Sequence, residues 1–270
     1  MSRSMRWVIA SLAVLAFAPQ APAADLGFLR GSDVYGPAEA TFSNWSGFYF
    51  GGQVGYANVQ ADFANGTASL ISNLLRNSSL EDEAQVSGWT VLGDADKRAV
   101  TYGGFIGYNS QWENVILGIE GNYNRISLSV SDRDSLRRVV SAGGDVYDVT
   151  VTSEAGLRIT DYGTVRARAG YVMGRFLPYL MAGFAMGRVE STRSASVIAF
   201  DEPTGSPYQP LYASETKATY ALGYSVGAGI DVMVLSNLFL RGEFEWLQFT
   251  NLPDEKAQMA IGRVAAGLKF

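Results

Sequence analysis

One pentapeptide matches the G-x-S-x-G pattern that surrounds the nucleophilic serine of many hydrolases: Gly223-Tyr224-Ser225-Val226-Gly227. A serine nucleophile needs a neighbouring base, usually a histidine, to accept its proton. The chain contains no histidine, and the pentapeptide lies in a segment that alternates like a β-strand. In hydrolases, by contrast, the motif lies at a strand-to-helix turn. We therefore predict that the chain has no catalytic residues and is not an enzyme.

Two acidic clusters, Glu81-Asp82-Glu83 and Asp94-Ala95-Asp96, raise the question of a divalent cation. Because short acidic runs are usually solvated, we favour an acidic loop at both places. The sequence carries no Walker loop, dinucleotide fingerprint or Cys/His metal spacing. We predict no metal and no cofactor.

A third group of candidate functional residues consists of charged side chains at alternate positions of otherwise apolar segments. Opposite charges on neighbouring strands can pair across a β-ladder. Such charges either line a pore and select ions or neutralise one another inside a filled barrel. We favour the second interpretation because a barrel of about eight strands is only wide enough for side chains. The predicted lumen charge network comprises Glu120, Arg166, Arg168, Arg241, Glu243, Glu245 and Arg263.

The elements that position these charges are segments in which large apolar residues alternate with small or polar ones, the signature of a β-strand. In residues 238–247, for example, Leu240, Phe244 and Trp246 occupy one phase, while Arg241 and Glu243 occupy the other. The segments are 48–57, 100–109, 115–124, 162–171, 177–187, 220–231, 238–247 and 260–270. We predict an all-β fold, an eight-stranded antiparallel transmembrane up-and-down β-barrel.

Two features favour a membrane barrel over a soluble one. The segments are long enough to cross the hydrocarbon at a tilt, which takes about 9–11 residues, and the charged phase is rich in Gly, Ala and Ser, as a narrow interior requires. Aromatic residues would also form a girdle at each interface. One predicted girdle contains Phe48, Tyr108, Tyr171 and Phe270, and the other contains Tyr56, Tyr102, Tyr123, Phe184, Tyr220 and Trp246.

The connections alternate in length, as in outer-membrane barrels with short periplasmic turns and long outer loops. The short connections are 110–114, 172–176 and 232–237, and the predicted outer loops are 60–99, 127–158, 189–218 and 250–258. Residues 69–76 fit a short helix and an irregular loop equally well.

The N-terminus has the features of a secretory signal. Arg3 and Arg6 precede the apolar run Trp7–Ala18, and Ala21-Pro22-Ala23 follows it. We predict a cleaved signal peptide at 1–23, a flexible N-terminal periplasmic arm at 24–44 and the barrel at 45–270. Cleavage would change the formal net charge from −5 to −7, which argues against nucleic acid as a partner.

Five stretches in order, 45–52, 164–171, 175–179, 223–229 and 240–245, resemble the small porin-like outer-membrane protein family of alphaproteobacteria, whose barrel is similar to the OmpA transmembrane domain. The resemblance implies a major surface protein of the bacterial outer membrane, in contact with outer-membrane lipid and lipopolysaccharide. It also implies that the terminal Phe270 is an assembly signal through which the C-terminal strand meets the barrel-assembly machinery. The chain ends at the last predicted strand, so we expect no OmpA-type peptidoglycan-binding domain.

Three functions remain open. The first, which we favour, is a structural and surface-exposed role in the outer membrane. The second is a small porin or gated channel for ions and small solutes. The third is a surface receptor or adhesin that binds an extracellular ligand through its long loops.

Overall fold

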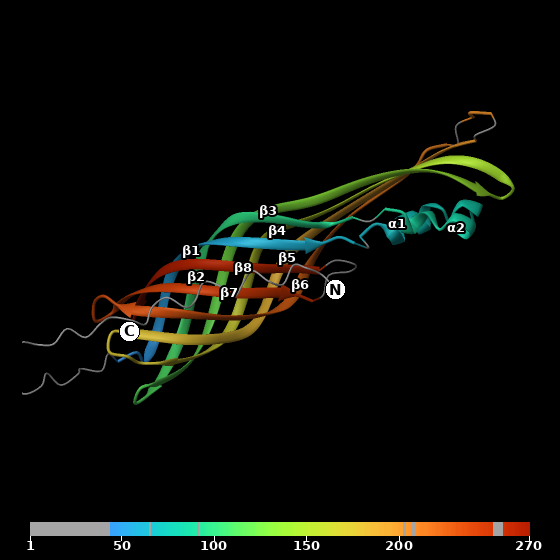
Figure 1. The fold of residues 1–270 in the computed structure, drawn as a ribbon. Helices are drawn as coiled ribbons and strands as arrows, with labels where there is room; N and C mark the ends of the chain where they lie inside the picture. The colour runs from blue at the N-terminus through green and yellow to red at the C-terminus, as the bar shows by residue number, and fades with distance from the viewer. Residues whose placement is uncertain (1–43, 65, 91, 202–203, 207–208, 251–255) are drawn as a thin grey trace, which may run out of the picture. The chain divides into compact units, whose positions relative to one another are not determined.

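The computed structural model describes residues 44–64, 66–90, 92–201, 204–206, 209–250 and 256–270. The predicted signal peptide, and the predicted arm except for Asn44, lie outside these residues. The described strands are β1 (Gly47–Asp62), β2 (Asp94–Trp112), β3 (Val115–Ala142), β4 (Asp145–Tyr171), β5 (Phe176–Asp201), β6 (Leu211–Met233), β7 (Leu238–Phe249) and β8 (Lys256–Lys269). Each strand pairs antiparallel with its neighbour in sequence, and β8 closes on β1 (Figure 1). The predicted eight-stranded up-and-down barrel is confirmed.

The pairing register shows how strongly the strands are staggered. A path of paired residues that leaves Phe50 on β1 returns to β1 at Gln60, ten residues farther along. With eight strands, this stagger corresponds to a strand tilt of roughly 40°. The path runs through Ile106, Gly121, Val165, Phe184, Tyr224, Gln248 and Gln258.

The barrel wall has its apolar side chains outside and its charges inside. On β7, Leu240 is 51% and Phe244 is 53% exposed, whereas the alternating Arg241, Glu243 and Glu245 are buried. A sheet with this arrangement would be unstable in water, because large apolar side chains cover its outer surface. It is suited to a surrounding of lipid.

The aromatic residues of the outer wall lie near both ends of this apolar band. At the end with the short turns, the Phe48 and Tyr108 rings are 4.9 Å apart, and the Phe50 and Phe270 rings stack at 5.5 Å. At the other end, Tyr224 pairs with Phe184 and its ring lies 5.7 Å from that of Trp246. Tyr220 pairs with Arg188, four residues nearer the extended end of β6.

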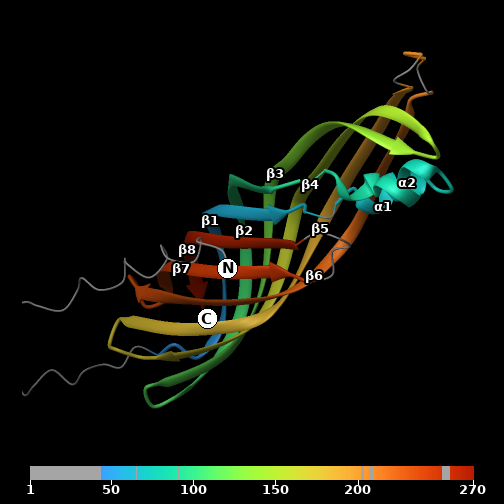
Figure 2. The same ribbon diagram turned by 45° about the vertical axis from the view of Figure 1, so that its right-hand side comes forward.

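Four strands continue beyond the barrel. Pairing between β2 and β3 ends at Thr101 and Ile126, and pairing between β6 and β7 ends at Gly223 and Phe249. Beyond these points β3 to β6 form an open four-stranded sheet, which we call the extended sheet (residues 127–142, 145–160, 188–201 and 211–222) and which Figures 1 and 2 show running past the other strands.

The prediction of loops at 127–158 and 189–218 was therefore wrong. Most of these residues belong to β-strands, and β3 turns into β4 at Gly143-Gly144, where both φ angles are positive. The alternation continues through this region, with Leu128 and Val130 buried and Ser129 and Ser131 exposed. Its polar phase is serine and threonine instead of glycine and charge, and this composition resembles a loop.

Two short helices cover one face of the extended sheet. Helix α1 (Ala68–Leu74), helix α2 (Ser79–Ala84) and the 3-10 turn η1 (Val86–Gly88) follow β1. Of the two interpretations of residues 69–76, the structure supports the helix. No helix in the described part of the chain is long and apolar enough to span a membrane. The apolar cluster between helices and sheet contains Ile71, Leu75, Leu80, Val86, Trp89, Val149, Val151, Ala195, Val197 and Ala199.

Candidate functional site: the charge layer of the lumen

The inward phase of five strands brings eight charged residues together in the lumen. All seven residues of the predicted charge network are among them, and Asp231 of β6 is the eighth. Each of the eight side chains is at most 2% exposed. We call this set, four arginines and four acids with a formal sum of zero, the charge layer: Glu120, Arg166, Arg168, Asp231, Arg241, Glu243, Glu245 and Arg263.

Arg166 contacts carboxylates on two other strands. Its Nη1 donates to Glu243 Oε1 at 2.8 Å and to Glu245 Oε1 at 3.1 Å, and its Nη2 donates to Glu120. Glu120 lies on the adjacent strand β3, whereas Glu243 and Glu245 lie on β7, three strands away in the barrel order. Arg263 of β8 also binds Glu245 and approaches Glu243, with its Nε 3.2 Å from Oε1. One guanidinium therefore ties opposite sides of the barrel together.

A second group of contacts centres on Asp231. Arg168 Nη2 donates to Asp231 Oδ2 at 2.7 Å, and Arg241 Nε donates to Oδ1 at 2.8 Å. Arg241 Nη1 also donates to Glu120 Oε2 at 2.7 Å, which joins this group to Arg166. Such charge-assisted contacts are the strong class of protein hydrogen bonds. The charge layer is thus one connected network.

Aromatic residues complete the network on the side of the short turns. The Tyr49 hydroxyl donates to Glu120 at 2.9 Å, and the Tyr179 hydroxyl donates to Glu243 at 2.8 Å. The Arg168 guanidinium lies 3.9 Å from the Tyr179 ring centroid, and that of Arg241 lies 4.4 Å from the Phe105 ring centroid. These cation–π contacts stabilise arginines that have lost their hydration.

Sequence reasoning missed Asp231, Tyr49 and Tyr179 as members of this site. The signal for Asp231 was available, since it falls on the inward phase of its segment and pairs in register with Arg241 across the turn at 234–237. Tyr49 and Tyr179 also fall on the inward phase, but the sequence does not show that their hydroxyl groups reach Glu120 and Glu243.

Apolar clusters occupy the lumen on both sides of the charge layer. Along β7 the inward residues are Phe239, then the three charges at 241, 243 and 245, then Leu247 and Phe249. Phe239 belongs to a cluster at the short-turn end, and Leu247 and Phe249 belong to one at the other end. The first cluster includes Trp45, Ile116, Val172, Leu177 and Met233, and the second includes Ala57, Val59, Ile126, Tyr162, Met259 and Ile261.

The inward phase is rich in Gly, Ala and Ser, as the sequence indicates, and the structure adds a cluster of large apolar side chains at each end of the lumen. Among the described residues, large apolar side chains are buried in close contact on both sides of the charge layer. The lumen is packed in three layers, and the charged side chains form the middle layer.

The other chemically suggestive residues are not brought together into a site. Ser225 lies within β6, is 1% exposed and pairs with Leu247 of β7, so its hydroxyl faces the lumen far from any strand-to-helix turn. Glu83 accepts from the Gly143 backbone N–H at 3.2 Å, which is a structural contact. Within the described ranges, no three His, Cys, Asp or Glu side chains are grouped so that they could hold a metal ion.

Comparison with known proteins gives consistent matches. The family model described as "Outer membrane protein beta-barrel domain" matches residues 9–270. A "25 kDa outer-membrane immunogenic protein" of Brucella ovis is 25% identical over 266 residues, 97% of this chain and 96% of the relative. A "22 kDa outer membrane protein" of Rhizobium leguminosarum bv. viciae is 30% identical over 162 residues, 58% of each chain.

Among solved structures, Neisserial surface protein A is 16% identical with a TM-score of 0.38, covering 83% of this chain and 98% of its own. Ail of Yersinia pestis is 12% identical with a TM-score of 0.28, covering 83% of this chain and 99% of its own.

Proposed function

Because this chain belongs to the family of outer-membrane protein β-barrel domains, we propose that it is a closed, non-conducting barrel that anchors the extended sheet at the cell surface. The observation that carries this proposal is the three-layered packing of the lumen, with the charge layer between two apolar clusters. A barrel with this interior acts through its lipid-facing wall, which is part of the outer membrane, and through the extended sheet, which it presents at the cell surface.

A pore would require the charge layer to separate. Removal of one partner from a buried ion pair costs about 3–5 kcal/mol, and Arg166 alone contacts three carboxylates. Opening a path would also expose the apolar clusters, at about 25 cal/mol for each Å² of apolar surface. Both costs favour the closed barrel over the porin alternative.

Liposome swelling with small sugars tests this proposal. The full-length protein, refolded into liposomes and shown to be folded by its heat-modifiable migration on a gel, should give no swelling with arabinose or sucrose. An open porin in matched liposomes supplies the positive control. Swelling at a rate that rises with the amount of folded protein would overturn the proposal in favour of the channel.

A surface-binding role has its own support in the uncovered face of the extended sheet. This face carries a polar hollow of about 480 Å³ with Ser129, Ser131, Arg158 and Thr192 in its lining. Shortening the β3–β4 and β5–β6 hairpins to the barrel rim should remove binding to host surfaces from intact cells, while heat-modifiability is kept. Unchanged binding by folded, shortened barrels would exclude the adhesin role for this face.

We propose no catalytic role, because Ser225 is buried and the chain has no histidine to activate it.

We also propose that β8 with Phe270 carries the contact to the barrel-assembly machinery. Phe270 is 70% exposed, and its backbone N–H donates to the Phe48 carbonyl at 2.8 Å, so the ring is presented outward at the seam between β8 and β1.

A further inference from the structure

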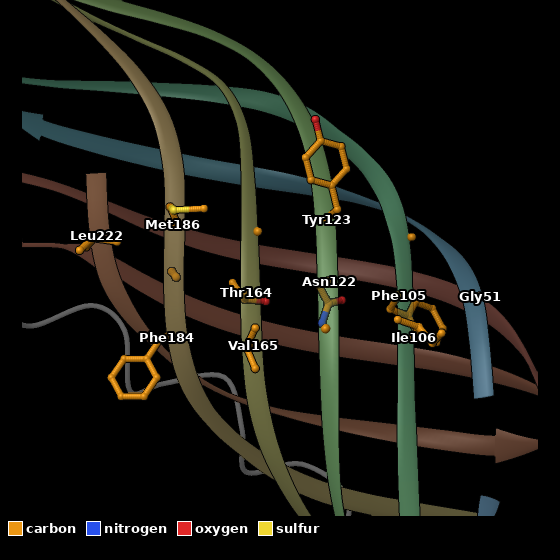
Figure 3. Close-up of a pocket in the computed structure, with 14 residues that line it drawn as sticks. Gly51, Phe105, Ile106, Asn122, Tyr123, Thr164, Val165, Phe184, Met186 and Leu222 are labelled. Carbon is orange, nitrogen blue, oxygen red and sulfur yellow. The ribbon is translucent and has the colours of Figure 1, made fainter. Parts of the chain in front are cut away.

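The outer wall of the barrel contains a hollow that crosses β2 to β5 and reaches Gly51 of β1 and Leu222 of β6. Its volume is about 710 Å³, and its surface is largely apolar. Figure 3 shows the side chains around it. Glycines Gly104, Gly121 and Gly163 contribute to its lining, and larger side chains border it: Ile106, Tyr123, Val165, Phe184, Met186 and Leu222.

The hollow exists because glycines replace large residues on the outward phase. A Cβ atom built on Gly121 would meet nothing within 4 Å, and one on Gly104 or Gly163 would meet only a backbone oxygen at 3.2 Å. Outward neighbours on the same strands, such as Tyr123 and Ile106, are more than half exposed. The outer wall therefore has a floor of glycine backbone at this place, surrounded by projecting large side chains.

The hollow lies in the half of the wall that is nearer the extended sheet. Tyr123 and Phe184, which border it, belong to the predicted girdle at that end, and Leu222 is the first extended-sheet residue of β6 beyond Gly223, where pairing with β7 ends. On the proposed orientation this is the outer leaflet. There the hollow faces the acyl chains of the surrounding lipid.

Two arginines stand just beyond the hollow. On β3, Arg125 is two residues closer to the extended sheet than Tyr123. On β5, Arg188 is two residues closer to it than Met186, and both arginines are exposed. Asp161 lies between them, since it pairs with both in register. Within the described ranges neither arginine is within 4.0 Å of a carboxylate oxygen, while Asp161 accepts from Thr160 Oγ1 at 3.0 Å. The group has a net charge of +1 at the height of lipid headgroups.

We propose that the hollow is a specific binding site for one acyl chain of a phosphorylated glycolipid of the outer leaflet, with Arg125 and Arg188 binding its phosphate. Guanidinium groups suit phosphate because they donate two parallel hydrogen bonds. The acyl chain gains contacts with the glycine floor that a flat apolar wall cannot give. This inference rests on the proposed orientation, with the extended sheet outside the cell, and is independent of whether the lumen conducts.

Native mass spectrometry of the full chain in detergent, titrated with bisphosphorylated lipid A, tests this site. Gly121→Leu fills the hollow and should weaken lipid A binding about tenfold, since burial of only two methylene groups has this effect. Gly242→Leu is the matched control, because Gly242 on β7 also has nothing within 4 Å of a built Cβ and does not line the hollow. It should leave the dissociation constant unchanged.

The double variant Arg125→Gln/Arg188→Gln tests the headgroup separately, at exposed positions that the fold tolerates. It should weaken binding of lipid A and leave binding of dephosphorylated lipid A unchanged. Equal affinities of the Gly121→Leu and Gly242→Leu variants would overturn the acyl site, and equal affinity of the wild type for lipid A and phosphatidylglycerol would overturn the glycolipid. Either failure leaves the swelling result, and with it the closed barrel, unaffected.

Discussion

Arg166 and Glu243 form a hydrogen bond across the lumen, with 2.8 Å between Nη1 and Oε1, although their strands β4 and β7 are not neighbours in the barrel. The contact shows that the lumen is narrow enough for side chains of these two strands to meet inside it. Neither side chain is more than 1% exposed. Contacts with each other and with the rest of the charge layer therefore replace their contacts with water.

Loss of Arg166 should therefore be costly. Arg166→Ala leaves Glu120, Glu243 and Glu245 with fewer cations, and we expect the free energy of unfolding to fall by about 3–5 kcal/mol. Urea unfolding of the protein in lipid vesicles measures this change. Arg98→Ala, at an exposed position of β2, should leave the unfolding midpoint unchanged. Equal midpoints for both variants would contradict a stabilising charge layer.

The pair Arg137–Asp148 in the extended sheet should respond to pH. Hydrogen bonds from Arg137, whose Nε donates to Asp148 Oδ1 at 2.8 Å, hold the pKa of Asp148 below its ordinary value. The stabilisation from this pair is therefore complete at neutral pH and is lost as the pH falls below about 3.9 through the lowered pKa. Carboxyl NMR of Asp148 should show a higher titration midpoint in Arg137→Gln than in the wild type. Identical midpoints would show that the pair does not form in solution.

The helices over the extended sheet should be necessary for its order but not for the barrel. Ile71 of α1 is completely buried in the cluster between helices and sheet, so Ile71→Asp places a charge in an apolar contact. We expect faster protease cleavage within residues 127–158 and unchanged heat-modifiability. Ser69→Asp, on the exposed side of the same helix, is the control. Loss of heat-modifiability in Ile71→Asp would mean that barrel and extended sheet fold as one cooperative unit.

Phe270 should affect assembly of the barrel in cells more than refolding of the purified protein. We expect Phe270→Ala to reduce the amount of folded protein in the outer membrane, because its ring is presented outward at the β8–β1 seam, while refolding of the purified variant in detergent stays efficient. Phe176→Ala removes another exposed aromatic at the same end of the barrel. A similar loss in both variants would point to membrane anchoring and not to an assembly signal.

The sequence predicted the barrel because lipid imposes a strict alternation on every strand, as on 238–247 with Leu240 and Phe244 outside. It also placed seven of the charge-layer residues on the inward phase. The cross-lumen contact of Arg166 with Glu243 was beyond its reach, because any shift of two residues between strands preserves the faces. Only the register, with its ten-residue stagger, brings β4 and β7 side chains to the same height.

Two other features escaped prediction for related reasons. Ile261 and Leu247 lie on the inward phase, but alternation alone does not show that inward apolar residues from different strands pack into one layer, because this depends on the register. The extended sheet was mistaken for loops because Ser129 and Ser131 have the composition of a loop. Beyond the membrane a strand needs apolar residues on one face only, so Leu128 and Val130 were the informative positions.

Planar-bilayer conductance tests the closed lumen most directly. Folded wild-type protein, inserted in a bilayer in 1 M KCl, should give no steady current steps above the lipid baseline over the range of ±100 mV. Regular, ohmic steps that scale with the number of inserted molecules would contradict a charge layer sealed between apolar clusters.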